Sequence, residues 1–100
     1  MQLIASVDHP ETPSLRISPR LRSQIVYFMT PADQPGLPAI GENEYWIAKD
    51  DVTRWLSEGV LELISPLDTD KVTEVELTEE QESFLAWLNK HGVQHIRVAD

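Results

Sequence analysis

One phrase of this sequence occurs in two copies, WLSEGV at residues 55–60 and WLNKHGV at residues 87–93. Each copy predicts a helix that ends at a glycine and passes directly into a β-strand. Glycine adopts the left-handed backbone conformation that closes a helix, and the valine after it folds back onto the last turn. In a Schellman arrangement that valine is expected to contact the apolar residue five positions earlier, Trp55 in the first copy and Leu88 in the second. The two junctions indicate architecture and not chemistry.

Strands and helices are expected to alternate around these junctions. The apolar spacing predicts strands over 44–48, 60–64, 72–77 and 93–98. Asp50 is expected to cap the first helix, while Thr78 and Gln81 form a capping box at the start of the second. The resulting order over 44–98 is β-α-β-β-α-β, the ferredoxin-like connection pattern. We therefore predict a single α+β domain over 1–100, with a mixed β-sheet and two helices on one face.

The N-terminal part, residues 1–30, is expected to add strands to this unit or to form a second small sheet. Residues 21–30 fit two interpretations. Ser18 and Pro19 are a favourable helix start, and apolar residues follow at helical spacing. Residues 25–29, however, are a continuous β-favouring run. We favour the strand. Three prolines and two glycines then predict a loop over 31–43.

Length and composition indicate a soluble globular protein. The chain has 100 residues, of which 41% are hydrophobic, enough for one domain with a modest core. No apolar run approaches the roughly 20 residues that cross a bilayer, and the first residues lack the basic region of a signal peptide. We therefore expect a cytoplasmic protein. The absence of cysteine excludes disulfides, thiolate metal ligands and cysteine nucleophiles.

Acidic residues dominate the second half of the chain. The formal net charge is −9, of which residues 1–43 carry only −1. Such a charge repels the phosphate backbone of nucleic acids and favours a partner with a basic surface. Solubility alone also explains a high negative charge. We expect a protein partner, and neither a nucleic acid nor a membrane.

The strand phases predict one polar sheet face opposite the helices, and it carries Trp46, Glu74, Glu76, His95 and Arg97. In a ferredoxin-like sheet the strand of Trp46 lies between the strand of the two glutamates and the strand of His95 and Arg97. A tryptophan flanked by carboxylates and by an imidazole–guanidinium pair is a candidate surface for a ligand or partner. Alternatively, the N-terminal strands cover Trp46 and the charges form ordinary cross-strand pairs.

No motif indicates catalysis or a cofactor. His91 and His95 are separated by the glycine that ends a helix, so they do not share a helical face as zinc-binding pairs do. The sequence has no glycine-rich phosphate loop and no Gly-x-Ser-x-Gly motif. We expect no metal and no cofactor. Leu37, between two prolines in the predicted loop, is a further candidate contact for a partner.

Two classes of function remain. The first is a small acidic protein that works by binding another protein, as a regulatory or accessory module. The alternative is a small-molecule-binding protein or enzyme that uses the sheet face around Trp46. Mimicry of a nucleic acid ranks lower, because Glu79, Glu80 and Glu82 cluster at a helix start instead of lying at regular spacing.

Overall fold

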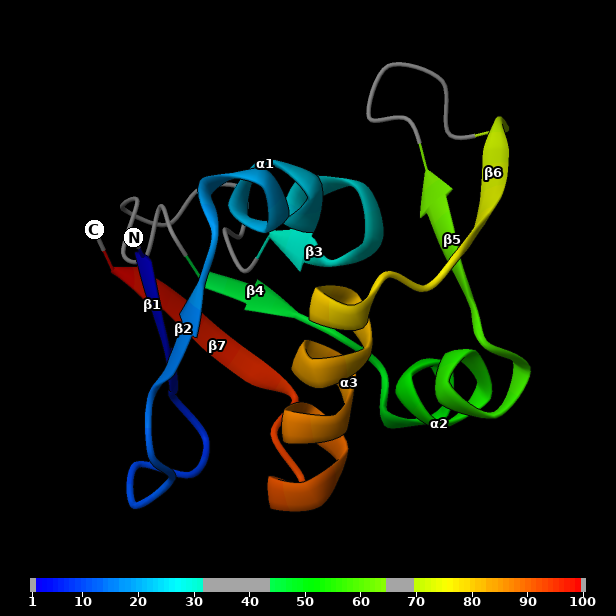
Figure 1. Cartoon of the computed structure of the whole chain (residues 1–100). Helices are drawn as coiled ribbons and strands as arrows, with labels where there is room; N and C mark the ends of the chain where they lie inside the picture. The colour runs from blue at the N-terminus through cyan, green and yellow to red at the C-terminus, as the bar shows by residue number, and fades with distance from the viewer. Residues whose placement is uncertain (1, 32–43, 65–69, 100) are drawn as a thin grey trace.

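The computed structural model describes residues 2–31, 44–64 and 70–99 (Figure 1). The elements of these residues are, in chain order, β1 (Gln2–Ser6), β2 (Leu15–Ile17), α1 (Pro19–Phe28), β3 (Thr30–Pro31), β4 (Glu44–Trp46), α2 (Lys49–Glu58), β5 (Val60–Ile64), β6 (Val72–Glu76), α3 (Glu79–His91) and β7 (His95–Ala99). The protein is a small α+β domain, as predicted. The predicted loop over 31–43 falls almost entirely outside the described residues.

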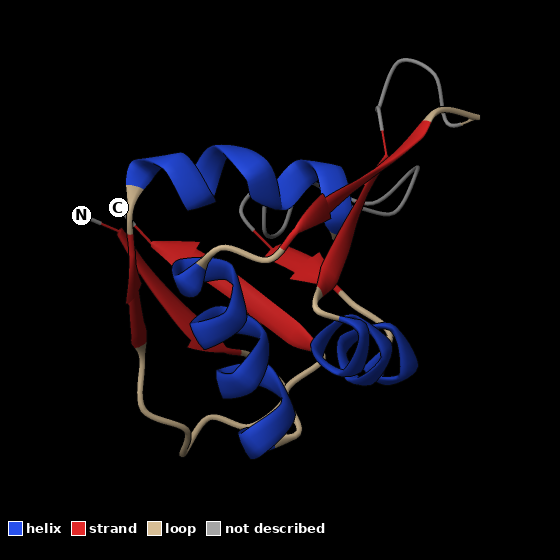
Figure 2. Cartoon of the chain, turned by 45° about the vertical axis from the view of Figure 1, so that its right-hand side comes forward, coloured by secondary structure: helices blue, strands red, loops and turns tan. Residues whose placement is uncertain are grey.

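The strands form two separate sheets. Five of them make one sheet in the order β2-β1-β7-β4-β3, and β5 and β6 make a second sheet of two strands. All neighbouring pairs in both sheets are antiparallel, so the prediction of a mixed sheet was wrong. Helices α1 and α3 lie on one side of the five-stranded sheet, and α2 packs beside α3 (Figures 1 and 2).

The ferredoxin-like connectivity is not confirmed. The element order β4-α2-β5-β6-α3-β7 occurs, and the expected β4–β7 and β5–β6 pairs form. The pair that would join the two halves, β4 with β6, is missing from the described residues. The reason is competition for β4: β7 occupies one edge of this short strand, and β3, from the N-terminal part, occupies the other.

The strand preferred for residues 21–30 was wrong, because this region forms α1. Ser18 caps the helix, its side-chain oxygen accepting a hydrogen bond from the Leu21 N–H at 3.2 Å. The proline after it has no backbone N–H, which costs nothing in the first turn of a helix. Leu21, Ile25 and Phe28 are buried, the spacing of one helical face. Their burial outweighed the local β-propensity.

Both repeated phrases end a helix at a glycine with positive φ, but they do so differently. At Gly92 the Val93 N–H donates to the Leu88 carbonyl at 2.9 Å, which is the predicted Schellman bond. At Gly59 the glycine's own N–H donates to the Trp55 carbonyl at 2.8 Å, the simpler αL motif. Strand β5 begins directly after Gly59, whereas β7 begins only at His95.

Of the two predicted helix caps, the one at the start of α3 is confirmed and the one at the start of α2 is wrong. The capping box of α3 is confirmed, with Thr78 and Gln81 exchanging backbone and side-chain hydrogen bonds. Asp50 does not cap α2. The helix begins two residues earlier than predicted, with Ala48 at the cap position, and Asp50 and Asp51 lie in the first turn. There their charge still favours the positive end of the helix dipole.

One hydrophobic core joins the sheet to the helices. The five-stranded sheet contributes alternate residues, which include Ile4, Ile96 and Val98. Phe28 lies between the rings of Trp55 and Phe84, at centroid distances of 6.3 and 6.1 Å. This aromatic contact connects all three helices. The alternation also leaves the opposite face of the sheet free of core residues, and that face carries the candidate site.

Candidate binding surface on the sheet face

Trp46 lies on the sheet face that points away from the helices. Its neighbours Tyr45 and Ile47 are buried, while Trp46 is 46% exposed. The predicted strand phase is therefore correct here. The N-terminal strands do not cover Trp46, because β1 and β2 extend the same sheet beyond β7.

The Trp46 ring is held by a stack on His95. The two residues are direct cross-strand partners of β4 and β7. Their ring centroids are 4.1 Å apart and their planes meet at 27°. His95 is mostly buried, its side chain 13% exposed, so it forms a fixed base under the indole.

Beneath this stack lies a buried carboxylate that the sequence analysis did not single out. The Glu44 side chain is only 7% exposed, with Oε1 2.8 Å from His95 Nε2 and Oε2 3.4 Å from Arg97 Nη2. Arg97 is the cross-strand partner of Glu44, and its side chain is 59% exposed. We refer to Glu44, Trp46, His95 and Arg97 as the tryptophan cluster. The i, i+2 alternation of β4 places Glu44 beside Trp46, so the same pattern contained the signal.

His95 keeps one unsatisfied polar atom in this arrangement. Its Nε2 is buried and forms no hydrogen bond with any residue that the structure describes. Glu44 Oε1 is near enough, but it lies off the direction of a ring N–H. The contact between His95 Nε2 and Glu44 Oε1 is therefore electrostatic. A buried carboxylate needs a nearby cation, and the exposed Arg97 guanidinium supplies one.

Asp8 fixes the start of β7 next to the cluster. Its carboxylate accepts hydrogen bonds from the Gln94 N–H at 3.0 Å and from the Ser6 hydroxyl at 2.9 Å. Partial burial raises the pKa of Asp8, but these hydrogen bonds outweigh it and lower the pKa below its ordinary value. The Val7 N–H also donates to the His95 carbonyl at 2.9 Å. The first loop thus positions the strand that carries His95 and Arg97.

Glu74 and Glu76 are not part of this surface, contrary to the sequence prediction. Both belong to β6, which pairs with β5 in the separate sheet. Glu74 lies opposite Glu62 of β5 instead of beside Trp46. Leu37, the other predicted contact residue, falls outside the described residues. The structure therefore brings together three of the predicted residues, Trp46, His95 and Arg97.

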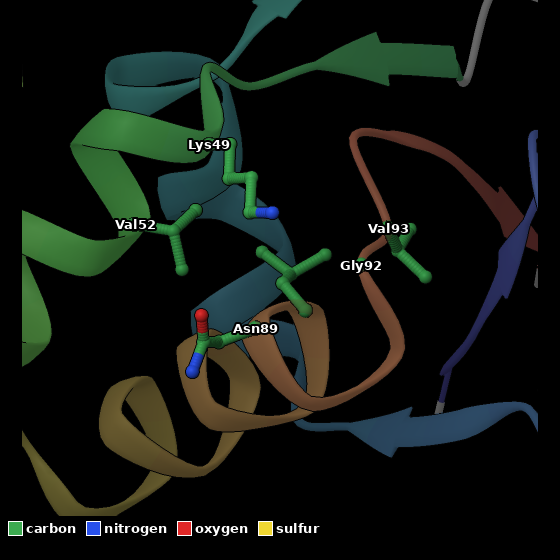
Figure 3. Close-up of a pocket in the computed structure, with 6 residues that line it drawn as sticks. Lys49, Val52, Asn89, Gly92 and Val93 are labelled. Carbon is green, nitrogen blue, oxygen red and sulfur yellow. The ribbon is translucent and has the colours of Figure 1, made fainter.

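Among the residues that the structure describes, two cavities lie away from the tryptophan cluster. One of about 10 Å³ lies between α2 and the end of α3, where Lys49 reaches into the gap toward Asn89 and Gly92 (Figure 3). It is too small for any ligand larger than one water molecule. The second, about 330 Å³, is an open groove between the end of α1 and the β5–β6 hairpin. Neither is lined by a residue of the tryptophan cluster.

Comparison with known proteins found no matching family model, no matching curated protein and no matching solved structure. Within residues 2–31, 44–64 and 70–99, no three side chains of His, Asp or Glu are grouped so that they could hold a metal ion. No helix in the same ranges has the length and apolar character needed to cross a bilayer. The geometry of the tryptophan cluster is thus what supports a function.

Proposed function

We propose that this chain is a small protein-binding module, and that its partner contacts the tryptophan cluster. The observation that supports this is a nearly half-exposed Trp46 held in one orientation by the His95 ring beneath it. Tryptophan and arginine are the side chains most enriched among residues that dominate binding energy, and Arg97 lies on the same face. A pre-organised anchor loses little conformational entropy on binding.

The position of Trp46 away from the described cavities favours a protein over a small molecule as the partner. Small-molecule sites are concave and bury most of their ligand. Trp46, by contrast, stands on an open strand face, and both described cavities lie elsewhere. An exposed aromatic on a sheet, supported from below, fits insertion into a pocket of the partner.

In this proposal the chain works in the cytoplasm as a regulatory or accessory subunit. The formal net charge of −9 supports a partner with a basic surface, because opposite potentials accelerate encounter. The same charge disfavours a nucleic acid or an anionic membrane as partner.

The test is affinity capture of the tagged chain from its own cells, with quantitative mass spectrometry of what it retains. We expect one or a few proteins to be retained by the wild type, lost with Trp46→Ala and retained in part with Trp46→Phe. Val26→Ala on α1 is the matched control, since Val26 is also exposed, at 37%, and lies outside the cluster. With the purified partner, Trp46→Ala is expected to weaken Kd at least about 30-fold, equivalent to about 2 kcal/mol. Equal retention by all four proteins, or retention of no protein by the wild type, would contradict the proposal.

A second candidate function is binding or conversion of a small molecule on the same face. The observation that favours it is the close contact between His95 Nε2 and Glu44, two polar groups held next to the exposed Trp46 ring. A metabolite at a hundredfold excess over its Kd is expected to raise the unfolding free energy by about 2.7 kcal/mol. A thermal-shift screen measures this, and the gain must disappear in His95→Ala for the ligand to belong to this face.

A further inference from the structure

Neither outer edge of the two-stranded β5–β6 sheet has a strand partner among the described residues. Strand β5 packs against α1 and α2, so its position on the body is fixed. Strand β6 pairs with β5 and with no other strand of the described residues. Figures 1 and 2 show the hairpin projecting from the body of the domain. An unpaired strand edge presents backbone donors and acceptors on which another extended chain can align.

The two faces at this edge have opposite character. Thr73 and Val75 lie on the face shared with Leu61 and Leu63, which packs toward the core. On that side opens the groove of about 330 Å³, which is lined mainly by apolar atoms of Tyr27, Leu63, Ile64, Lys71 and Thr73. A chain added along β6 would therefore have apolar space on one side.

Glutamates occupy the other face. Glu74 is the direct cross-strand partner of Glu62, and Glu76 follows two residues later. Glu62 is compensated, since it contacts the Arg54 guanidinium and accepts a hydrogen bond from the Trp55 indole N–H at 3.1 Å. Glu74 and Glu76 are exposed, and neither forms an ion pair with a residue that the structure describes. Like charges directly opposite each other destabilise a hairpin, so a cation supplied from outside would be favourable here.

Exposed apolar side chains also lie toward the end of the hairpin, where the pair Ile64–Val72 follows the pair Glu62–Glu74 on the same face. Ile64 and Val72 are cross-strand partners that are 43% and 48% exposed. Tyr27, on the facing end of α1, is 41% exposed. Exposed apolar side chains gathered in this way mark a contact surface more often than isolated ones do.

We propose that the free edge of β6 takes an extended segment of a partner protein in which apolar residues alternate with lysine or arginine. Side chains of an added strand point alternately to its two faces. The apolar ones would then enter the groove beside Thr73, and the basic ones would pair with Glu74 and Glu76. A second copy of this chain does not fit, because pairing two β6 edges brings glutamate against glutamate. This surface is separate from the tryptophan cluster, so the inference goes beyond the proposed function.

The probe is a synthetic peptide of about nine residues, the length of a long strand, in which lysine and valine alternate. We expect saturable amide NMR shifts confined to β6 and to the groove residues, together with slower hydrogen exchange along β6. A peptide of the same composition with its lysines and valines in two blocks is the control. Equal binding of the block peptide, or shifts scattered over the acidic surface, would show non-specific attraction and overturn the proposal.

Two pairs of substitutions test the charge pairing. Glu74→Gln with Glu76→Gln is expected to weaken peptide binding about threefold to tenfold, the sum of two exposed ion pairs. Glu79→Gln with Glu82→Gln removes the same charge from the start of α3 and is expected to leave Kd unchanged. Reversal, Glu74→Lys with Glu76→Lys, is expected to transfer binding to a peptide of alternating glutamate and valine. Equal weakening by the two neutral pairs, or no transfer on reversal, would refute the pairing.

Trp46→Ala separates this inference from the proposed function. We expect it to leave binding of the lysine–valine peptide unchanged, even where it abolishes capture of the partner. Loss of peptide binding in Trp46→Ala would instead place the peptide on the tryptophan cluster and overturn the β6 site.

Discussion

The five-stranded sheet and the β5–β6 hairpin differ in the burial and the charge partners of their glutamates. Glu44 in the sheet is 6% exposed and contacts His95 and Arg97. Glu74 in the hairpin is exposed and faces another glutamate. The first arrangement uses a buried carboxylate to fix an aromatic surface. The second leaves negative charge available to whatever lies alongside the strand.

The largest change in unfolding free energy is expected when the His95 imidazole is removed from the five-stranded sheet. His95→Ala deletes both the support of Trp46 and the imidazole that contacts buried Glu44. We expect the unfolding free energy to fall by about 2–3 kcal/mol, less than for a fully buried pair because Arg97 stays in place. Chemical denaturation measures this. A loss below about 0.5 kcal/mol, the range of ordinary surface substitutions, would show that Glu44 does not depend on His95.

The two glycine junctions allow each region to be weakened separately. Gly59 precedes β5 of the hairpin, and Gly92 lies before β7 of the sheet. Both have positive φ, and a Cβ atom at either position would meet no close neighbour. We therefore expect Gly59→Ala and Gly92→Ala to destabilise about equally, by about 1–2 kcal/mol, through backbone strain alone. Hydrogen exchange should accelerate first in the hairpin for Gly59→Ala and in β7 for Gly92→Ala. The opposite order would contradict the assignment of one junction to each region.

These two regions also differ in how far the sequence predicted them. Features set by neighbouring residues were predicted correctly. They are the capping box at Thr78, the glycines that end α2 and α3, and the strand alternation that exposes Trp46. Glu44 followed the same alternation but was overlooked, because nothing local indicates that its carboxylate is buried. The position of β6 was not predictable from its own residues. In a ferredoxin-like sheet β6 would pair with the free edge of β4. Here β3, which is distant from β6 in the sequence, pairs with that edge instead.

Residues 21–30 show a second limit of local pattern. Ile25 and Val26 favour strands by propensity, yet both lie in α1. Ser18 provided the correct signal by capping the helix, and it also binds the Glu80 carboxylate of α3 through its own N–H at 2.9 Å. That second contact joins residues 62 positions apart in the sequence and cannot be read from neighbouring residues. Tertiary packing therefore decided between two local preferences of similar strength.

A smaller effect is expected from relieving the repulsion in the hairpin. Glu74→Lys replaces the Glu62–Glu74 repulsion with a cross-strand attraction. We expect the unfolding free energy to rise by about 0.5 kcal/mol, in the range measured for cross-strand pairs. Glu76→Lys is the control, since its cross-strand partner is Val60 and no charge lies opposite. An equal gain in both variants would assign the effect to net charge and not to the cross-strand pair.

The smallest expected effect is on the pH dependence of the unfolding free energy in acid. It concerns Asp8, beside the five-stranded sheet, and does not involve the β5–β6 hairpin. The pKa of Asp8 is lowered in the folded protein from its ordinary value of 3.8. The unfolded chain therefore binds this proton at higher pH than the folded one does, and the stabilisation is fully present above the ordinary value. It is lost as pH falls through the lower folded pKa. Asp8→Asn abolishes this titration, so its unfolding free energy should decline less steeply than that of the wild type over that acid range. Denaturation curves in a pH series measure how steeply the unfolding free energy depends on pH in each protein. Equal steepness in the wild type and Asp8→Asn would show that the Gln94 and Ser6 hydrogen bonds do not lower the pKa of the folded carboxylate.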